Sequence, residues 1–492
     1  MLTTESCPDL PPARRTRSRP EAPGSGALLL SVPLLWSCAL GAWGLSRGGS
    51  LWQDEAISHD MARRDLGEIW ATVQDVDAVH GLYYALLHVV FEVFGPGLGA
   101  LRWPSVIAMG AAAGAVALLG RELAGARAGW AAGLVFPLLP AVQQYAQEGR
   151  SYALVTCLVT WSTWALVRAA RKPPGRAWIP YAALLAAACW MHEFALLVLP
   201  AHALALAALR ADRRVLRSWA LAAACAVAAG LPVIVVSMRQ AAQVSWIAGT
   251  SWGDVTPWAL AAAIGALGRL VLRRTEAAGA WEAALALFLG PAVTLLVLSL
   301  FRDLYVDRYV LYAQAGLALL VGVAVERCAG AGLWRWVAGA GAAAFTAYAL
   351  AVAAPALRSP DSRSDDVRAM VSAIGEMDRS ADGFVFLPSN RRAWVLHDNP
   401  EVPPHFTDLL LRQSPRASDT LYGTDVTSSA VADRMTSVCR ILAVRDPGLE
   451  KIETSPQDDE KRRVLDQEFT ARESFRVSKA QITLFVRNAC AE

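Results

Sequence analysis

Residues 27–55 read ALLLSVPLLWSCALGAWGLSRGGSLWQDE, an apolar stretch that leads directly into the carboxylate pair Asp54 and Glu55. The apolar part, 27–45, is long enough to cross a bilayer as a helix. Four arginines between positions 14 and 19 precede it, as in a signal peptide, but its length predicts a first membrane helix that is retained. Adjacent carboxylates repel each other, so a pair this close to the membrane boundary indicates a site for a cation or a hydroxyl substrate. A solvated helix cap is the alternative interpretation.

The composition identifies a membrane protein. The chain has 492 residues, of which 55% are hydrophobic and 18% charged, and apolar runs of membrane-spanning length recur from residue 27 to 355. This pattern excludes a soluble enzyme. The net charge of only +3 gives no reason to expect a nucleic-acid partner.

We expect about eleven membrane helices, and the basic residues fix their orientation. The predicted spans are 27–45, 103–120, 128–146, 151–168, 177–192, 194–210, 216–238, 257–272, 282–300, 309–325 and 333–354. Alternate connections hold most of the basic residues, namely Arg14–Arg19, Arg121/Arg127, Arg168/Arg171/Lys172/Arg176, Arg210/Arg213/Arg214/Arg217, Arg273/Arg274 and Arg327/Arg335. Because cytoplasmic loops carry the excess of Lys and Arg, the chain is predicted to be a multi-pass plasma-membrane protein with its N-terminus inside and its C-terminal part outside.

The segments between and after the spans divide the chain into three parts. They are a cytoplasmic tail, 1–26, a membrane domain, 27–355, and an extracytoplasmic domain, 356–492. In the first outer loop, 57–74 and 79–94 are predicted to be helices lying in the membrane interface. The C-terminal part predicts a small α/β domain, with strands at 384–387, 440–444 and 481–487 and helices near 364–378 and 458–472.

The cysteines give one candidate cross-link. Most of the eight lie singly in apolar segments, without the spacing of a metal site, but Cys439 and Cys490 are alone together in the C-terminal part. An outer compartment permits a disulfide between them. Two free thiols are the alternative, because the sequence does not give their separation in space.

With this orientation, the polar residues that interrupt apolar stretches gather on the outer side. They are Asp54/Glu55, Asp77/His80/Tyr83/Tyr84, Arg102, Gln147/Glu148/Arg150/Tyr152, His192/Glu193 and Arg302/Asp303/Asp307/Arg308/Tyr309. Three of these groups have a structural alternative: an ion pair for Glu148 with Arg150, a satisfied interfacial histidine for His192, and an interfacial anchor for Arg308 with Tyr309. Ionisable groups at membrane depth are costly, so their gathering on one face predicts a pocket. Its carboxylates would deprotonate a nucleophile, and its arginines would hold a phosphate from the headgroup layer.

Five stretches carry a resemblance to a known family. They are Trp52-Gln-Asp-Glu-Ala56, Asp77-x-x-His80-Gly-Leu-Tyr-Tyr84, Ala100-Leu-Arg-Trp-Pro-Ser105, Tyr145-Ala-Gln-Glu-Gly-Arg-Ser-Tyr152 and Asp307-Arg-Tyr309. In order and spacing they resemble the GT-C glycosyltransferases over residues 25–355, in the family 39-like branch of protein O-mannosyltransferases and the aminoarabinose transferase. Gly81 and Gly149 depart from the family, which often has a proline pair and an alanine there. The part 356–492 matches no module of this family.

The resemblance implies an inverting transfer of a mannose-like hexose or a pentose from a polyprenyl-phosphate donor to an acceptor hydroxyl outside. Asp54 would be the general base, and Glu55 would orient the acceptor or assist a metal. The residues implied to bind the donor phosphate or the substrate are His80, Tyr83, Arg102, Glu148, Arg150, Tyr152, His192, Arg308 and Tyr309. Either no cofactor is required, or Asp54 and Glu55 hold Mg²⁺ or Mn²⁺.

Two other functions compete with this one. A transporter or lipid flippase also has many spans, but it would place charges near the bilayer midplane in repeated halves. A non-catalytic assembly or sensor protein would not need the carboxylate pair. The partners expected are the donor, membrane lipid and an acceptor whose class, glycan, lipid or protein, the sequence leaves open.

Overall fold

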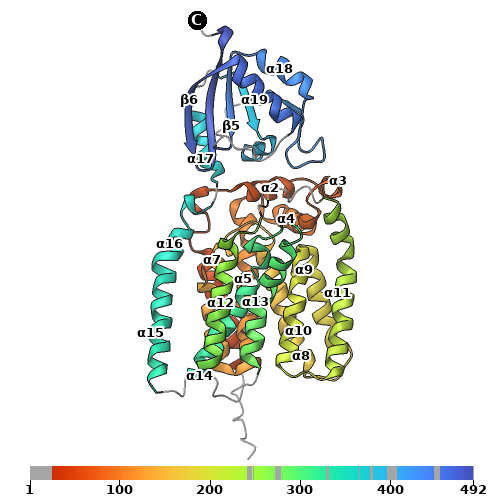
Figure 1. The fold of residues 1–492 in the computed structure, drawn as a ribbon, viewed down its shortest axis with the longest axis vertical. Helices are drawn as coiled ribbons and strands as arrows, with labels where there is room; N and C mark the ends of the chain where they lie inside the picture. The colour runs from red at the N-terminus through yellow and green to blue at the C-terminus, as the bar shows by residue number, and fades with distance from the viewer. Residues whose placement is uncertain are drawn as a thin grey trace, which may run out of the picture.

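The computed structural model describes residues 25–240, 247, 249–271, 279–328, 332–363, 365–376, 381–395, 407–447 and 455–490. Within them the chain forms a bundle of long helices with a smaller domain of helices and strands at one end (Figure 1). This arrangement confirms the predicted class, a helical membrane bundle with a small C-terminal α/β domain. The predicted cytoplasmic tail, 1–26, lies almost wholly outside the described residues.

The predicted spans all fall on helices, although the number of membrane crossings is not confirmed. The bundle consists of α1 (Ser25–Ala42), α5 (Leu98–Ala124), α6 (Ala126–Val135), α7 (Pro140–Ala146), α8 (Tyr152–Ala170), α9 (Ile179–Met191), α10 (Val198–Ala208), α11 (Arg213–Arg239), α12 (Trp252–Val271), α13 (Ala280–Ser299), α14 (Ala313–Cys328) and α15 (Leu333–Tyr348). Among the described residues, six helical segments are long and apolar enough to cross a membrane. The other five predicted spans lie on α6 with α7, α9, α10, α12 and α14.

Close approach of the helices depends on glycine in α14. A Cβ atom added at Gly322 would lie 2.4 Å from the carbonyl oxygen of Ala128 in α6. At Gly316 it would lie 2.3 Å from the backbone nitrogen of Phe288 in α13. Small residues at such crossings let membrane helices approach backbone to backbone. These two positions therefore hold α14 between its neighbours.

Three shorter helices, α2 (Gln53–Ala62), α3 (Leu66–Asp75) and α4 (Gly81–Phe94), lie at the end of the bundle that faces the C-terminal domain (Figure 1). The single helix predicted at 57–74 is divided into α2 and α3. The division occurs because Asp65 and Glu68 form a capping box that begins a new helix.

The C-terminal domain is built on a five-stranded sheet in the order β2-β1-β5-β7-β6. Its strands are β1 (Gly383–Leu387), β2 (Thr407–Asp408), β5 (Arg440–Arg445), β6 (Phe469–Val477) and β7 (Ala480–Arg487), and β3 (Leu411–Gln413) pairs separately with β4 (Thr424–Asp425). Strand β1 runs parallel to β2 and β5, whereas β7 is antiparallel to β5 and β6. The three predicted strands are confirmed. Strand β6 was not predicted, and the helix predicted to end at 472 ends at Glu468.

Alternating residues of the sheet face two different cores. Val385 and Leu387 belong to a cluster under α18 (Ser428–Thr436) and α19 (Pro456–Glu468). Phe384 and Phe386 belong to the large cluster that continues into the outer helices, together with α17 (Val367–Glu376).

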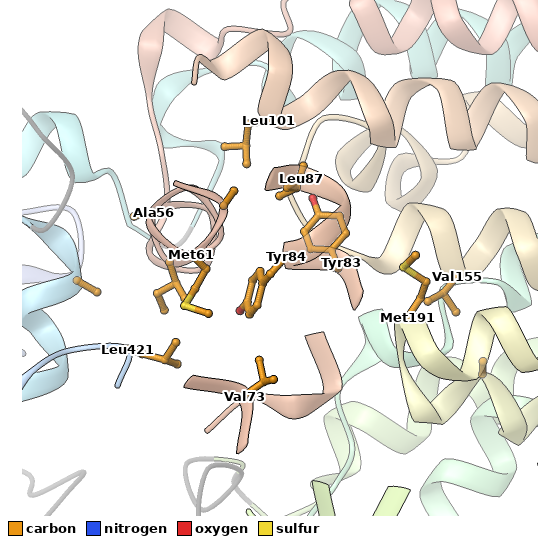
Figure 2. Packing of buried hydrophobic residues seen from close by; sticks show 14 of the residues in the cluster. Ala56, Met61, Val73, Tyr83, Tyr84, Leu87, Leu101, Val155, Met191 and Leu421 are labelled. Carbon is orange, nitrogen blue, oxygen red and sulfur yellow. The ribbon is translucent and has the colours of Figure 1, made fainter. Parts of the chain in front are cut away.

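The same cluster joins the domain to the bundle. Leu421 of the C-terminal domain lies in it with Met61, Val73 and Tyr84 of the outer helices (Figure 2). The shared apolar contact holds the C-terminal domain against the end of the bundle that carries α2, α3 and α4.

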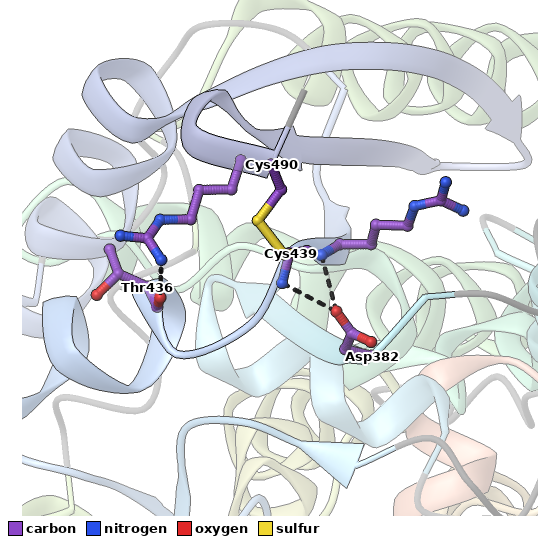
Figure 3. The surroundings of a disulfide bond; sticks show 6 residues. Asp382, Thr436, Cys439 and Cys490 are labelled. Atoms are coloured by element: carbon purple, nitrogen blue, oxygen red, sulfur yellow. Dashed lines mark hydrogen bonds between the residues drawn. A yellow bond between two sulfur atoms is a disulfide. The ribbon is translucent and has the colours of Figure 1, made fainter. Parts of the chain in front are cut away.

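Cys439 and Cys490 form a disulfide, which decides between the two alternatives left by the sequence. Their Cα atoms lie 5.8 Å apart. The bond fastens the residues after β7 to the start of β5, where Asp382 accepts hydrogen bonds from the backbone N–H groups of Cys439 and Arg440 (Figure 3).

Candidate functional site

A cavity of about 1300 Å³ lies between the C-terminal domain and the end of the bundle that faces it. Seven of the eleven predicted site residues line it: Asp54, His80, Arg150, Tyr152, His192, Arg308 and Tyr309. They come from α2, the 3-10 helix before α4, the start of α8 and the turn before it, the N-cap of the 3-10 helix before α10, and the 3-10 helix before α14. Segments far apart in the sequence thus supply one polar wall, as the predicted gathering on the outer side requires.

Asp54 lies in the first turn of α2, between two arginines. Its Oδ2 atom is 3.9 Å from Nη2 of Arg150 and 3.9 Å from Nη2 of Arg308. These distances exceed a hydrogen bond, so the attraction is electrostatic and leaves room around the carboxylate. The Asp54 side chain is 25% exposed, against 7% for Arg150 and 18% for Arg308. The carboxylate is therefore open to the cavity and faced by two cations.

Arg150 is held by a chain of polar groups. It donates to Nε2 of His80 at 3.1 Å and to the hydroxyl of Ser58 at 3.3 Å. Because a guanidinium only donates, Nε2 of His80 accepts, and its Nδ1–H donates to Asp77 at 2.8 Å. Tyr84 donates its hydroxyl to the same carboxylate.

The surroundings of Asp77 favour its charged form. Burial raises its pKa, but the hydrogen bond from His80 and the charge of Arg150 outweigh burial and lower the pKa to about 2. Asp77 was part of the motif that supported the resemblance, yet it was not among the predicted site residues.

Aromatic rings surround Arg308. Its Nε donates to the Tyr152 hydroxyl at 3.2 Å, and its guanidinium carbon lies 5.8 to 5.9 Å from the rings of Trp52, Tyr152 and Tyr309. The ring of His192 is 4.9 Å from that of Tyr309. Cation–π contacts of this kind hold a guanidinium in place at the wall of the cavity.

Glu55 lies behind this wall and has a different environment from Asp54. Its two oxygens accept four hydrogen bonds: two from Arg102 at 2.7 Å, one from Arg47 at 2.6 Å and one from the backbone of Gly149 at 2.9 Å. Burial raises its pKa, but the charges of Arg102 and Arg47 outweigh burial and lower it to about 2. The side chain is fully buried. The expectation that Glu55 orients the acceptor does not fit this geometry.

Arg102 is part of the same buried unit. It also donates to the carbonyl oxygens of Leu45 and Ser50, and its side chain is inaccessible to solvent. These bonds tie the outer end of α1 to α5. Arg102 therefore does not face a phosphate in the cavity, contrary to its predicted role.

Glu148 and Tyr83 also lie outside the cavity wall. Glu148 pairs with Arg363 at 2.6 Å, and both side chains are buried. This ion pair ties the loop before α8 to the segment that leads into the C-terminal domain. Tyr83 is fully buried in the large apolar cluster. Neither side chain is placed to touch a donor.

The carboxylate pair does not fit a divalent cation. All four lone-pair directions of Glu55 are taken by N–H donors, so it has no oxygen to offer a metal. Within the described part of the chain, no group of three or more His, Cys, Asp or Glu side chains is arranged to hold one. Asp54 alone, beside two arginines, is a weak ligand for Mg²⁺ or Mn²⁺.

Sequence reasoning missed the contribution of the C-terminal domain. Arg391 donates to the side chain of Gln53 at 2.6 Å, directly before Asp54. Asp365 accepts from the backbone N–H of Gln53 at 3.2 Å, and Val367 donates to the carbonyl oxygen of Leu51. One signal was present, because Trp52 precedes α2 and has no side chain that can cap a helix.

Comparisons with known proteins agree with this architecture. A family model described as dolichyl-phosphate-mannose-protein mannosyltransferase matches residues 81–238. The structure is similar to that of ArnT from Cupriavidus metallidurans in the apo state, with a TM-score of 0.53 and 13% identity over 94% of this chain and 98% of that one. For ArnT bound to undecaprenyl phosphate, the TM-score is 0.50 and the identity 12%, with the same coverage. No curated protein matches the chain by sequence.

Proposed function

We propose that this chain, which has the fold of the GT-C superfamily, is a membrane glycosyltransferase that uses a polyprenyl-phosphate-linked sugar. The sugar would pass, with inversion, to an acceptor hydroxyl on the outer face of the membrane. One observation carries the proposal: an accessible carboxylate, Asp54, faces Arg150 and Arg308 at 3.9 Å each, in a cavity at one end of the membrane bundle.

The two arginines are suited to the donor phosphate. A guanidinium keeps its charge and offers paired N–H groups to phosphate oxygens. Arg150 is fixed by His80, and Arg308 is fixed by Tyr152 and the surrounding rings. ArnT has been solved with undecaprenyl phosphate bound, which supports a lipid phosphate as the ligand of this fold. The polyprenyl chain would lie along the helices in the outer leaflet.

The chemistry follows from these positions. Asp54 takes the proton of the acceptor hydroxyl as its oxygen attacks the anomeric carbon of the sugar. The bond from that carbon to the phosphate oxygen breaks, and the polyprenyl phosphate leaves with the bonding electrons. Arg150 and Arg308 stabilise the charge that grows on the phosphate. We propose that they balance this charge without a divalent cation, since Glu55 offers no free oxygen.

The proposed orientation puts the C-terminal domain outside the cell. The connection from α10 to α11 lies at the opposite end of the bundle (Figure 1). It contains Arg210, and Arg213 and Arg214 begin α11 directly after it. This agrees with the excess of basic residues expected in cytoplasmic loops. The ionisable groups of the cavity lie at the outer end of the bundle, which does not favour a transporter.

The test uses the full chain in lipid nanodiscs with radiolabelled undecaprenyl-phosphate sugars, namely mannose, arabinose and aminoarabinose, and a cell-envelope extract as acceptor. The expected result is release of free undecaprenyl phosphate from at least one donor, with label appearing in the extract and EDTA having no effect. A chain that leaves every donor intact, or that moves one across vesicle membranes without cleaving it, would contradict the proposal.

A further inference from the structure

One wall of the cavity is formed by the C-terminal domain, at one particular edge of its sheet. Residues 388–391 directly follow β1, and Asp446, which pairs with Arg391 at 2.7 Å, directly follows β5. Strands β1 and β5 are parallel, so their carboxyl ends lie at the same edge. Open α/β sheets bind ligands at this edge. We call the lining residues between 388 and 479 the roof of the cavity.

The roof is firmly built. Lys461 donates to Asp425 at 2.6 Å, to Asp458 at 2.9 Å and to Ser389 at 2.7 Å. The ammonium group is almost wholly buried. Asp425 also accepts from Arg392 at 2.6 Å. This network fixes three separate loops of the roof relative to one another.

Several polar groups of the roof remain available. Within the described residues, the Gln457 side chain has no hydrogen-bond partner, and one of the two oxygens of Asp458 has none. Asp458 is 3% exposed. Both residues lie in the first turn of α19 and line the cavity. An amide beside a carboxylate offers a donor and several acceptors at one place, which suits vicinal hydroxyl groups.

Most positive charges of the roof are already paired with carboxylates, and among the described residues of the roof Lys479 is the exception. Arg391, Arg392 and Lys461 are each paired with a carboxylate. The N-terminus of α19 would attract an anion, but Asp458 and Asp459 in its first turn already offset its dipole. Lys479 is exposed at the turn between β6 and β7, in contact with solvent.

The size of the cavity allows two ligands at once. Pockets for one drug-sized molecule occupy roughly 300–1000 Å³. At about 1300 Å³, this cavity exceeds that range. A sugar phosphate held at Arg150 and Arg308 therefore leaves space beneath the roof.

From these observations we infer that the roof is the acceptor subsite and that it binds a neutral carbohydrate through Gln457 and Asp458. The inference rests on the proposed function and adds the class of the acceptor. A glycan bound there lies in the same cavity as Asp54. Apolar side chains are few in the roof, mainly Pro388 and Leu421, which favours a polyhydroxyl ligand over a peptide.

The test measures binding to the full chain in nanodiscs by isothermal titration calorimetry. The probes are linear hexasaccharides of mannose, glucose and arabinose, a Ser/Thr-rich peptide and a phosphorylated glycolipid. At least one hexasaccharide is expected to bind, with an affinity that hardly changes when salt rises from about 0.05 to 0.5 M. Gln457→Ala should lower the affinity for this hexasaccharide about tenfold, as expected for the loss of one or two hydrogen bonds.

The matched control is Gln467→Ala, because Gln467 lies on the same helix, is exposed and is outside the cavity. It should bind the hexasaccharide as the wild type does. The inference is overturned if no hexasaccharide binds, or if Gln457→Ala binds the hexasaccharide with wild-type affinity. It is also overturned if Gln457→Ala lowers the affinity for the peptide or the glycolipid instead. If only this inference is wrong, the chain still cleaves the donor. If the proposed function is wrong, no donor cleavage is measured.

Discussion

Asp365 caps the helix that carries Asp54 by accepting a hydrogen bond from the backbone N–H of Gln53, 312 residues earlier in the chain. The same carboxylate oxygen accepts from the indole N–H of Trp394 at 3.0 Å, inside the C-terminal domain. Since Trp52 supplies no cap of its own, the direction of the first turn of α2 depends on this contact. The C-terminal domain therefore positions the proposed base.

Asp365→Ala should lower kcat about tenfold while the dissociation constant for the donor stays the same. Loss of a helix cap costs about 1 kcal/mol, and a small displacement of a reacting group is enough to slow transfer. Arg150 and Arg308 lie on other elements and keep their places. Steady-state kinetics and donor titration measure the two quantities. Asp361→Ala, an exposed position on the same segment, is the control; equal kcat values for the two variants would contradict the role of the cap.

Asp54→Asn should reduce transfer by roughly 10²–10⁴-fold, the usual contribution of a general base. The amide keeps the shape of the side chain but accepts no proton, so the protein should insert and unfold as the wild type does. The measurement is single-turnover transfer with saturating donor. Asp75→Asn, an exposed aspartate at the end of α3, should leave the rate unchanged. An Asp54→Asn protein that transfers at the wild-type rate would defeat the proposed mechanism.

Glu55→Gln should act mainly on stability. Removing one member of a buried ion-pair network costs about 3–5 kcal/mol, because Arg47 and Arg102 would be left without their carboxylate. Thermal unfolding followed by tryptophan fluorescence should show a lower midpoint for Glu55→Gln than for Asp54→Asn.

The pH dependence provides a check on this assignment. The pKa of Glu55 is lowered to about 2, so its contribution to stability is complete above about pH 4.5 and is lost as the pH falls toward 2. The difference in midpoint between wild type and Glu55→Gln should shrink over that interval. Equal thermal midpoints for the wild type and Glu55→Gln at neutral pH would show that the ion pairs of Glu55 contribute nothing to stability.

Arg150→Ala and Arg308→Ala should weaken donor binding by about 10–100-fold each, as expected for hydrogen bonds to a charged group. They should also lower turnover further, because the phosphate charge grows as the bond breaks. Titration with undecaprenyl phosphate and transfer kinetics separate the two effects. Arg102→Ala is the contrasting variant and should lower the unfolding temperature. A normal donor affinity in Arg308→Ala would remove it from the phosphate site.

Replacing Cys439 and Cys490 with serine should destabilise the C-terminal domain by about 4 kcal/mol. This is the effect that chain entropy gives for a cross-link between residues 51 apart. Denaturant unfolding measures the loss, and alkylation without reductant should label neither cysteine in the folded wild type. Labelling of both thiols before reduction would show that the disulfide is not formed.

The sequence by itself determined the class of the protein and the place of its site. A bilayer offers no water to backbone groups, so apolar runs that cross it must form helices. This constraint allowed the membrane helices to be predicted from the sequence. The short apolar runs at 384–387, 440–444 and 481–487 predicted three strands of the sheet. The cost of charge at membrane depth predicted a polar pocket, and Asp54, Arg150 and Arg308 do line the cavity. The same criterion also selected Glu55, Arg102 and Glu148, which are buried outside it.

Only the tertiary structure separated the roles of Asp54 and Glu55. Successive residues of a helix point about 100° apart, so one carboxylate faces the cavity and the other faces the buried arginines. Which of the two carboxylates faces the cavity depends on the helices packed around α2. In the same way, the roof joins loops at 388–391 and 455–458 because β1 and α19 meet in space. Their contacts are set by long-range packing, which no local pattern in the sequence records.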